Sequence, residues 1–483
     1  MLPERLTAPL TVSLAVALAI RLCIAVAFPN AYAPDEIFQY IEQAHRLVFG
    51  LGYVPWEFQI GLRSWAIPLL LAAPMALAHW FTPAPLAGLM LIRILLCIAS
   101  LPIVWCATKW GERFHGTQGA WIAGLLTALW PDLWLMAPHP LEETLSTDLL
   151  IPAIYLVEAS RGQAGLRHVA WAGCLLGLTF ALREQLAPAV AVAGIFLCGR
   201  NTKRWLLALP MAAIPVFCAG LLDWFTWGEM FRSFWINIYL NIGLGISSHY
   251  FDSSPPYYYA LTLLYDWLWG ALFIACFAWF GGRKLPVAGL AALVTIIVHC
   301  CIAHKELRFI FPAMALLIPL AGVGLAGICA NRTALQKTLL TAGVLTGPWM
   351  SPMLYMMLPW QDSAFRLYAA LAARHPCVVS IQSWDRGFLP ILPVFDAPTR
   401  FTGETVNADA IIAAVNTTTI PLGFTRQSCT PESWIPFKQR KPDVCFWTRP
   451  VSSCQAGPVT PFVLVYPPAA KAFVIRDRLT DAP

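Results

Sequence analysis

The chain has 483 residues, of which 58% are hydrophobic and 12% charged, and its mean hydropathy is +0.63. These values exclude a soluble globular protein, because several stretches of about 20 apolar residues are each long enough to span a bilayer. A membrane β-barrel would show short alternating segments instead. The net charge of +6 gives no reason to expect nucleic acid binding. We therefore expect an all-α polytopic membrane protein.

The apolar segments predict about eleven transmembrane spans. The first, roughly 6–28, is interpreted as a retained signal anchor. The stretch 66–108 is broken near Pro83, and we expect it to cross once, with 66–80 re-entrant or lying flat; two full crossings are the alternative. The other predicted spans are 118–136, 143–159, 168–182, 184–198, 205–222, 257–280, 286–303, 308–328 and 337–357.

Basic residues orient these spans, because Lys and Arg gather in cytoplasmic loops. With a single crossing in 66–108, every basic cluster can face the cytoplasm. The clusters are Lys109/Arg113, Arg161/Arg167, Arg200/Lys203/Arg204, Arg283/Lys284 and Arg332/Lys337. The opposite, extracytoplasmic face then collects the polar loops, which are 29–65, 138–147, the surroundings of Arg183, 223–256 and the surroundings of His304.

The apolar runs stop near residue 358, which divides the predicted transmembrane module (1–358) from a small extracytoplasmic α/β domain (359–483). Strands are expected within 377–395 and over 461–466. Four cysteines in this domain allow three disulfide pairings, namely those among Cys377, Cys429, Cys445 and Cys454. No pair has zinc-like spacing, so we expect no structural metal site and no cofactor.

The most polar stretch near the N-terminus follows the first span directly. Pro34 suits the first position of a helix, which leaves Asp35 and Glu36 in its first turn, where the helix dipole favours anions. At about 100° per residue, one face is polar and the opposite face is apolar. The polar face holds Asp35, Gln39, Glu42 and Arg46, and the apolar face holds Ile37, Ile41, Ala44 and Val48. We expect an amphipathic helix at the membrane surface with its carboxylates towards water or a cavity.

Two interpretations of Asp35 and Glu36 stay open on the residues alone. The carboxylates can simply complement the start of a helix. Alternatively, one is a general base that removes a proton from an attacking hydroxyl, a role that partial desolvation near a membrane favours by raising proton affinity.

A second polar motif, His304-Lys305-Glu306-Leu307-Arg308-Phe309, lies between two apolar spans. Charges at membrane depth are costly and are rarely placed there without partners. One acid among three potential cations leaves a net positive cluster, which suits an anionic phosphate. A hydrated loop with snorkelling side chains is the alternative.

Other candidate residues fall on the same predicted face. Arg63 and Arg183 can reach a phosphate or sugar, although Arg183 can also pair with Glu184 or another acid. Glu142 and Glu143 open a helix, where capping is the expected role. In the aromatic loop 223–256, amides and imidazole suit sugar hydroxyls; these residues are Asn237, Asn241 and His249, beside Tyr250. An aromatic belt at the interface explains many of the rings.

These motifs resemble those of glycosyltransferase family 22, multi-span mannosyltransferases of glycosylphosphatidylinositol and N-glycan precursor assembly. The family's His-Pro-Asp-Glu-x-Phe-Gln resembles 33–39, where Ala33 replaces the His, and its His-Lys-Glu-x-Arg-Phe is matched in full by 304–309. Further similar elements are Glu42 to His45, Gly52-Tyr53, Trp56-Glu57-Phe58 and Gly61-Leu62-Arg63-Ser64. The resemblance covers most of residues 1–330.

The resemblance implies a GT-C fold and an inverting transfer of a sugar, most often mannose, from a polyprenyl- or dolichyl-phosphate donor to a lipid-linked or glycan acceptor. Asp35 would be the base, with Glu36 in support. The implied substrate-binding residues are Gln39, His45, Arg63, Arg183, Asn237, Asn241, His249, Tyr250, His304, Lys305, Glu306 and Arg308. Among them, Arg63, His304, Lys305 and Arg308 would stabilise the leaving phosphate.

Two other functions are compatible with a polar membrane protein. A flippase or transporter of lipid-linked sugars should show paired repeats and charges deep in broken spans, whereas the polar groups here gather on one face. A non-catalytic assembly subunit is disfavoured because both motifs are retained. Membrane lipids are expected partners and nucleic acids are not. Few lysines and abundant Ala and Pro favour a bacterial inner membrane, with the endoplasmic reticulum as the alternative.

Overall fold

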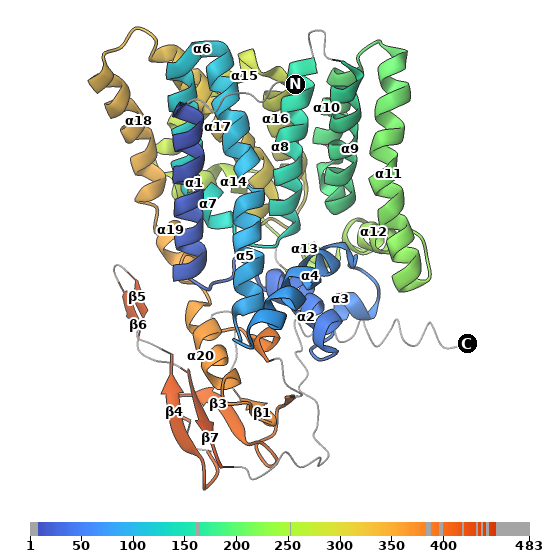
Figure 1. Cartoon of the computed structure of the whole chain (residues 1–483), viewed down its shortest axis with the longest axis vertical. Helices are drawn as coiled ribbons and strands as arrows, with labels where there is room; N and C mark the ends of the chain where they lie inside the picture. Colours follow the sequence, from blue (N-terminus) through green and yellow to red (C-terminus); the bar gives the residue numbers. More distant parts are fainter. Residues whose placement is uncertain are drawn as a thin grey trace. The chain divides into compact units, whose positions relative to one another are not determined.

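The computed structural model describes residues 8–160, 165–251, 253–382, 388–395, 399–417, 420–430, 433–435, 438–440 and 444–450 (Figure 1). The chain separates into two compact units, which are described in turn. Unit 1 comprises Met1–Ile24, Ser64–Ala66 and Ile94–Leu354, and unit 2 comprises Ala25–Arg63, Ile67–Arg93 and Tyr355–Pro483. The domain boundary expected near residue 358 stays a prediction.

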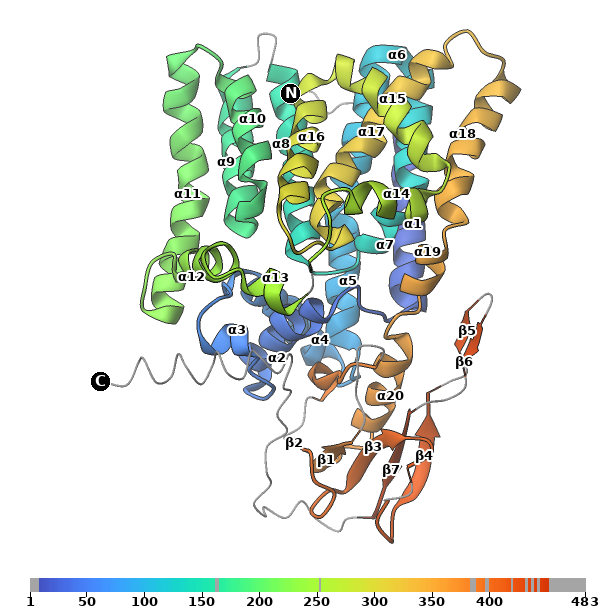
Figure 2. The same ribbon diagram turned by 180° about the vertical axis from the view of Figure 1, so that it is seen from behind.

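Unit 1 is a bundle of apolar helices, several of which run side by side in both views (Figures 1 and 2). Its helices, including those that begin or end at its limits, are α1 (Ala8–Ala27), α5 (Ala87–Ala99), α6 (Leu101–Leu129), α7 (Pro131–Met136), α8 (Glu142–Ser160), α9 (Leu166–Leu182), α10 (Ala187–Cys198), α11 (Thr202–Trp227), α12 (Arg232–Ile238), α13 (Ile246–Tyr250), α14 (Tyr258–Trp267), α15 (Gly270–Lys284), α16 (Pro286–Cys301), α17 (Phe311–Ile328), α18 (Ala334–Trp349) and α19 (Pro352–Met357). Short 3-10 or π turns are η2 (Glu184–Leu186), η3 (Tyr239–Gly243) and η4 (Leu307–Ile310).

Helix α17 is the core of this bundle. With η4 it forms one apolar run, and 89% of the most hydrophobic stretch of this run is buried. It packs against α6 and α15. Helices α17 and α15 approach each other closely at two glycines. A Cβ on Gly281 of α15 would lie 1.9 Å from the carbonyl oxygen of Leu320, and a Cβ on Gly324 of α17 would lie 2.0 Å from the carbonyl oxygen of Phe277. Small residues at such crossings let apolar helices pack backbone to backbone.

Every predicted span overlaps helices, and 66–108 overlaps three of them (Ala66–Phe81, α5 and the start of α6), so a multi-pass helical membrane protein is confirmed as the fold class. Within the described residues, four helical runs are long and apolar enough to cross a membrane, and a bent pair would make a fifth. The four are Ala8–Ala27, Ala87–Leu129, Thr202–Trp227 and Leu307–Ile328. The number of crossings, expected to be about eleven, stays a prediction.

Helix α6 reverses direction in its middle. His115 and Gly116 have non-helical backbone angles, and Gly116 lies at φ 59°. Beyond them the chain folds back, so that Gly111 and Gly119 meet: a Cβ on either glycine would lie 2.2 Å from the other's carbonyl oxygen. The predicted start of a span at residue 118 therefore coincides with this reversal.

The predicted span 257–280 is not one straight helix. Helices α14 and α15 are bent by 110° across Leu268, which lies at φ 49°. A carboxylate on α7 fixes the bend, because one oxygen of Asp132 accepts hydrogen bonds from the indoles of Trp130 (2.9 Å) and Trp267 (2.8 Å). Hydrophobicity gave no sign of this break, since the bend depends on a polar partner from another helix.

Unit 2 combines short helices with a mixed sheet. Its elements are η1 (Glu36–Ile41), α2 (Glu42–Phe49), α3 (Trp56–Gln59), α4 (Ala66–Phe81), α20 (Asp362–Ala372), β1 (Val378–Ile381), η5 (Leu392–Val394), β2 (Arg400–Thr402), β3 (Ala410–Ala414), β4 (Thr425–Cys429), β5 (Ser433–Ile435), β6 (Lys438–Arg440) and β7 (Val444–Thr448). The five-stranded sheet has the order β2-β1-β3-β7-β4, in which β1 pairs in parallel with β2 and β3, and β7 is antiparallel to β3 and β4. The hairpin β5–β6 is separate.

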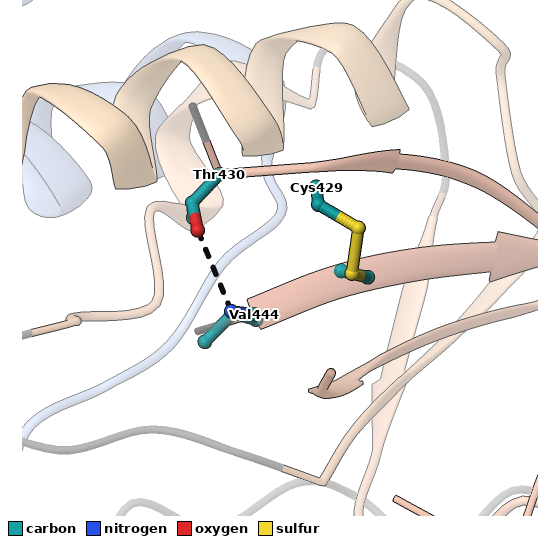
Figure 3. Close-up of a disulfide and its surroundings, with 4 residues drawn as sticks. Cys429, Thr430 and Val444 are labelled. Carbon is teal, nitrogen blue, oxygen red and sulfur yellow. Dashed lines mark hydrogen bonds between the residues drawn. A yellow bond between two sulfur atoms is a disulfide. The ribbon is translucent and has the colours of Figure 1, made fainter. Parts of the chain in front are cut away.

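This sheet confirms a small C-terminal α/β domain. The strand expected at the start of 377–395 is β1, whereas 461–466 lies outside the described residues. Of the possible pairings, Cys429 on β4 is bonded to Cys445 on β7, next to the hydrogen bond between the Thr430 hydroxyl and the Val444 amide (Figure 3). Cys377 is also disulfide-bonded, and Cys454 lies outside the described residues.

Candidate functional site

The first polar segment, up to Arg63, lies in unit 2 and begins with a π-helix. Over Glu36–Ile41 each backbone amide donates its hydrogen bond to a carbonyl one residue further back than in an α-helix. The amide of Glu42, for example, donates to the carbonyl of Ile37. Single π turns of this kind are common at functional sites. The partly exposed Asp35 immediately precedes η1, and the carboxylate of Glu36 accepts a 2.8 Å hydrogen bond from the Tyr32 amide.

The expected polar side of this helix is only partly exposed. Gln39 and Glu42 are at most 2% exposed, whereas Asp35 and Arg46 are partly exposed. Two features explain the difference. The π turn changes the angle per residue, so faces counted at 100° no longer apply, and the rest of unit 2 supplies polar partners for the buried groups.

Glu42 and Glu57 are buried acids of this segment. Glu42 accepts a 2.6 Å hydrogen bond from the Tyr53 amide. Gly52 makes this approach possible, because a Cβ there would lie 2.4 Å from the Glu42 carboxylate oxygen. Burial raises the pKa of Glu42 to about 7, although nearby His45 lowers it in part. A carboxyl with such a pKa changes charge near neutral pH.

Glu57 connects three of the predicted site residues. Its carboxylate accepts a 3.1 Å hydrogen bond from the Gln39 amide. Burial raises its pKa to about 7; Arg63 opposes this shift, and the negative charge of Asp35 adds to it. Asp35, Gln39 and Arg63 therefore surround one buried carboxyl that was not among the predicted site residues. Its signal in the sequence was the Trp56-Glu57-Phe58 element.

His45 has a backbone partner in the same segment. Its Nδ1 lies 3.1 Å from the carbonyl oxygen of Leu51. Because a carbonyl oxygen only accepts, Nδ1 carries a proton and donates this hydrogen bond. The ring is 2% exposed and also packs against Phe49, with ring centroids 4.5 Å apart. The contacts fix the turn that follows α2.

The second motif lies in unit 1, in the loop between α16 and α17. Glu306 accepts from both neighbours in the motif: its Oε1 lies 3.2 Å from His304 Nε2, and its Oε2 lies 2.7 Å from Arg308 Nε. The ammonium group of Lys305 instead donates hydrogen bonds to two backbone carbonyls. One is that of Ser254, at 2.9 Å, and the other is that of Ile302. Lys305 thus ties two loops together.

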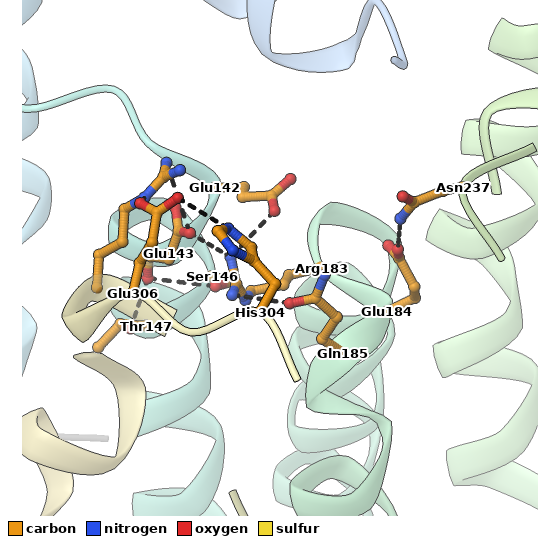
Figure 4. A network of polar contacts seen from close by, with 11 residues as sticks. Glu142, Glu143, Ser146, Thr147, Arg183, Glu184, Gln185, Asn237, His304 and Glu306 are labelled. Carbon is orange, nitrogen blue, oxygen red and sulfur yellow. Dashed lines mark hydrogen bonds and ion pairs between the residues drawn. The ribbon is translucent and has the colours of Figure 1, made fainter. Parts of the chain in front are cut away.

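Arg183 lies in the same network, at the end of α9. Its Nη1 is 2.7 Å from Glu143 and 3.0 Å from Glu142, and its Nη2 donates 2.9 Å to Gln185 (Figure 4). Glu143 is shared, because Arg308 Nη1 lies 3.8 Å from the same oxygen. The guanidiniums of Arg183 and Arg308 both lie over the Phe309 ring, 5.5 and 5.3 Å from its centroid.

Acids and cations therefore alternate through this site, which we call the charge ladder. Its members, in order of contact, are Glu142, Arg183, Glu143, Arg308, Glu306 and His304. Helix α8 adds two carboxylates to the basic groups of the motif, so acids from another helix offset much of its positive charge. Glu142 and Glu143 start α8 as expected, but they also pair with Arg183.

An amide chain lies beside the ladder. The carboxylate of Glu184 accepts a hydrogen bond from the side-chain amide of Asn237 (Figure 4). The side-chain amide of Asn241 donates in turn to Asn237. Arg183 therefore pairs with Glu142 and Glu143 rather than with Glu184. His249 is exposed on α13, and the side chain of Tyr250 lies outside the described residues.

The predicted site residues thus form two groups, one in each unit, and each group is defined by its own contacts. Within the described residues, no group of three or more His, Cys, Asp or Glu side chains is arranged to hold a metal ion. The expectation of no metal and no cofactor stays a prediction. Carboxylates, amides and guanidiniums are suited to bind hydroxyls and phosphates and to move a proton.

Known proteins resemble the chain in sequence and in fold. It is 26% identical over 336 residues to GPI alpha-1,2-mannosyltransferase 3 of Mus musculus, covering 65% of this chain and 59% of the relative. For the Danio rerio protein of the same name the identity is 25% over 377 residues, covering 74% and 66%. The chain thus spans about three fifths to two thirds of the length of these curated relatives.

A solved structure, ArnT from Cupriavidus metallidurans bound to undecaprenyl phosphate, matches with a TM-score of 0.62 at 12% identity, covering 93% of this chain and 99% of that one. This likeness confirms the GT-C fold. The profile of the Alg9-like mannosyltransferase family matches residues 12–376 and confirms the resemblance found in the motifs. Because that match covers most of the 483 residues, the chain belongs to the Alg9-like mannosyltransferase family.

Proposed function

We propose that the chain is an inverting mannosyltransferase that uses a polyprenyl-phosphate-linked mannose as donor and a lipid-linked or glycan acceptor. The family match carries this proposal. The acceptor hydroxyl oxygen attacks the anomeric carbon, and the bond from that carbon to the phosphate oxygen breaks. Polyprenyl phosphate leaves with the bonding electron pair, and the hydroxyl proton goes to an enzyme base.

Asp35 is the proposed base. It is partly exposed next to a π turn, whereas the neighbouring Glu36 is buried and bound to the Tyr32 amide. Glu57, the buried carboxyl close to Asp35, adds negative charge beside it when ionised. Glu36 keeps a supporting role, and Gln39 and Arg63 orient the carboxyls.

The charge ladder is the proposed site of the donor phosphate. His304 and Arg308 already hold a carboxylate between them, and a phosphate offers the same kind of acceptor oxygens. The solved neighbour named above is bound to undecaprenyl phosphate, which is consistent with a polyprenyl-phosphate donor. The amides of Asn237 and Asn241 and the ring of His249 suit sugar hydroxyls, and Tyr250 stays an expected neighbour.

The extracytoplasmic face is proposed for the chemistry. The Cys429–Cys445 disulfide supports it, because disulfides persist in oxidising compartments such as the periplasm or the endoplasmic reticulum lumen. The relatives cited are eukaryotic, so they give no support to the bacterial inner membrane expected from composition. No observation favours the transporter alternative.

The test is mannosyl transfer by the purified full chain in proteoliposomes. The donor is dolichyl- or decaprenyl-phosphate mannose, and the first acceptor to try is a mannosylated GPI precursor, because the cited relatives are named GPI alpha-1,2-mannosyltransferases. We expect transfer by the wild type and loss of about a thousandfold in Asp35→Asn, the scale of removing a general base. Asp362→Asn, an acid in α20 of the same unit paired with Arg366, is the matched control.

The outcomes separate the parts of the proposal. Full activity in Asp35→Asn would remove Asp35 as the base and direct attention to Glu36→Gln. Absence of transfer with either donor would contradict the donor class. Product anomeric configuration, read by NMR, tests inversion.

A further inference from the structure

Glu306 occupies the centre of the motif that would contact a phosphate. Its two carboxylate oxygens are divided between the two cations: Oε1 faces His304 Nε2 at 3.2 Å and Oε2 faces Arg308 Nε at 2.7 Å. A phosphate bound between an imidazole and a guanidinium would place two oxygens in the same way. The carboxylate therefore makes contacts of the kind that an anionic ligand would make.

The two acids that contact Arg308 differ sharply in exposure. The side chain of Glu143 is 1% exposed and is also paired with Arg183 at 2.7 Å. The side chain of Glu306 is 38% exposed. Arg308 itself is 7% exposed, so the Glu306 carboxylate is the solvent-accessible end of this pair and can leave it, whereas a buried shared carboxylate is difficult to remove. Glu143 is thus a fixed anchor of Arg308, and Glu306 is its exchangeable partner.

Glu306 stays charged while it occupies this position. Desolvation alone would raise its pKa, but Arg308 and His304 outweigh that cost and hold the pKa well below its ordinary value. The site therefore contains a resident anion throughout the physiological pH range. An incoming phosphate has to compete with it for the same donors.

We infer that the carboxylate of Glu306 occupies the phosphate position of the His304–Arg308 site and that polyprenyl phosphate displaces it, while Glu143 keeps Arg308 in place. The inference rests on the proposed function for its ligand. It assigns Glu306 a role opposite to that of a phosphate ligand. A phosphate ligand, when removed, weakens binding; a resident competitor, when removed, strengthens it.

The experiment measures binding of decaprenyl monophosphate to the purified full chain in detergent micelles by tryptophan fluorescence or native mass spectrometry. We expect Glu306→Gln to bind about fivefold more tightly than the wild type, the scale of losing one exposed ion pair. Glu229→Gln is the matched control, because Glu229 also pairs with an arginine, Arg232 at 2.9 Å, but lies outside the ladder. It should bind like the wild type. Equal or weaker binding in Glu306→Gln overturns the inference.

Two further arms keep the result interpretable. Glu306→Asp shortens the acid so that it no longer reaches both cations, and it should bind more tightly than the wild type even if the Gln variant fails to fold. In Arg308→Gln the gain from Glu306→Gln should disappear, because the contested donor is gone. Inorganic phosphate is the competing probe, which separates recognition of the phosphate from recognition of the lipid chain.

Failure of the inference and failure of the proposed function have different signatures. If the wild type transfers mannose but Glu306→Gln shows no gain in affinity, only the inference is overturned. If the wild type neither transfers mannose nor binds decaprenyl monophosphate, the proposed donor is wrong and the inference fails with it.

Discussion

The two polar segments handle their carboxylates in opposite ways. In unit 2, Glu42 and Glu57 are buried among amides and backbone groups, and burial raises the pKa of each to about 7. In unit 1, Glu306 lies between two cations, and its pKa is held below the ordinary value despite desolvation. One segment thus keeps carboxyls that titrate near neutral pH, and the other keeps Glu306 ionised beside its basic partners.

The difference suits two different chemical tasks. Proton transfer works best with groups that titrate near the working pH. Binding and stabilising a phosphate needs donors whose positions and charges do not change. The same residue type, glutamate, serves either purpose, and the neighbours brought by other elements decide which one.

The largest expected effect comes from breaking the ladder at its buried anchor. Glu143→Gln leaves Arg183 and Arg308 without their shared carboxylate, and removing one partner of a buried ion pair costs about 3–5 kcal/mol. Thermal and denaturant unfolding in detergent should show this loss. Glu142→Gln, the same change at a side chain that is 20% exposed, should cost about 1 kcal/mol or less. Equal losses in the two variants would contradict the distinction.

The next effect is a pH dependence in the first polar segment. The pKa of Glu42 is raised from 4.5 to about 7, so its contribution to stability is full below pH 4.5 and is lost as the pH rises through 7. At pH 8 the wild type holds a buried charge that Glu42→Gln lacks, and the variant should be more stable by about 3 kcal/mol. At pH 4.5 the two should unfold alike. Parallel unfolding profiles from pH 4.5 to 8 would show that Glu42 does not titrate as described.

A smaller effect is expected on catalysis from Glu57. As the pH rises through its pKa of about 7, Glu57 gains a negative charge near Asp35, the proposed base. We expect kcat/KM to rise about tenfold between pH 6 and 8 in the wild type and to stay nearly flat in Glu57→Gln. Glu229→Gln should keep the wild-type profile. An unchanged rise in Glu57→Gln would assign the titration to another group.

The smallest effect sharpens the contrast between the two acids of Arg308. Glu306→Gln should change the free energy of unfolding by less than about 1 kcal/mol, because its side chain is 38% exposed. The measurement is the free energy of unfolding of Glu306→Gln and of Glu143→Gln under the same conditions. A loss as large as that of Glu143→Gln would make Glu306 a structural anchor.

Apolar length predicted the helices well, because a run of about 20 apolar residues has few other stable arrangements in a bilayer. The motifs 33–39 and 304–309 also located both polar groups. The π turn after Asp35 was not predictable, since an extra residue per turn leaves no mark in composition. It changed which side chains share a face, and Gln39 and Glu42 of the predicted polar face are buried.

The partners within the charge ladder were equally invisible to the sequence. Glu143 and Arg308 are separated by about 165 positions, and nothing in either segment indicates that α8 returns to the motif. The break at Leu268 follows the same rule, because the carboxylate that accepts a hydrogen bond from Trp267 beside it, Asp132, is more than a hundred residues away. Local patterns predict elements, and long-range polar contacts decide how those elements function.

The reversal at His115 and Gly116 limits the length of the helical run in which it lies. The helical run Ala87–Leu129 has 43 residues, and if it were straight it would be about 65 Å long at 1.5 Å per residue. That is about twice the thickness of the hydrocarbon layer. Because the run folds back at His115 and Gly116, Gly111 and Gly119 lie against each other and the run is much shorter than that instead. The direction in which the second half of α6 runs is therefore set by the backbone angles of two residues, His115 and Gly116.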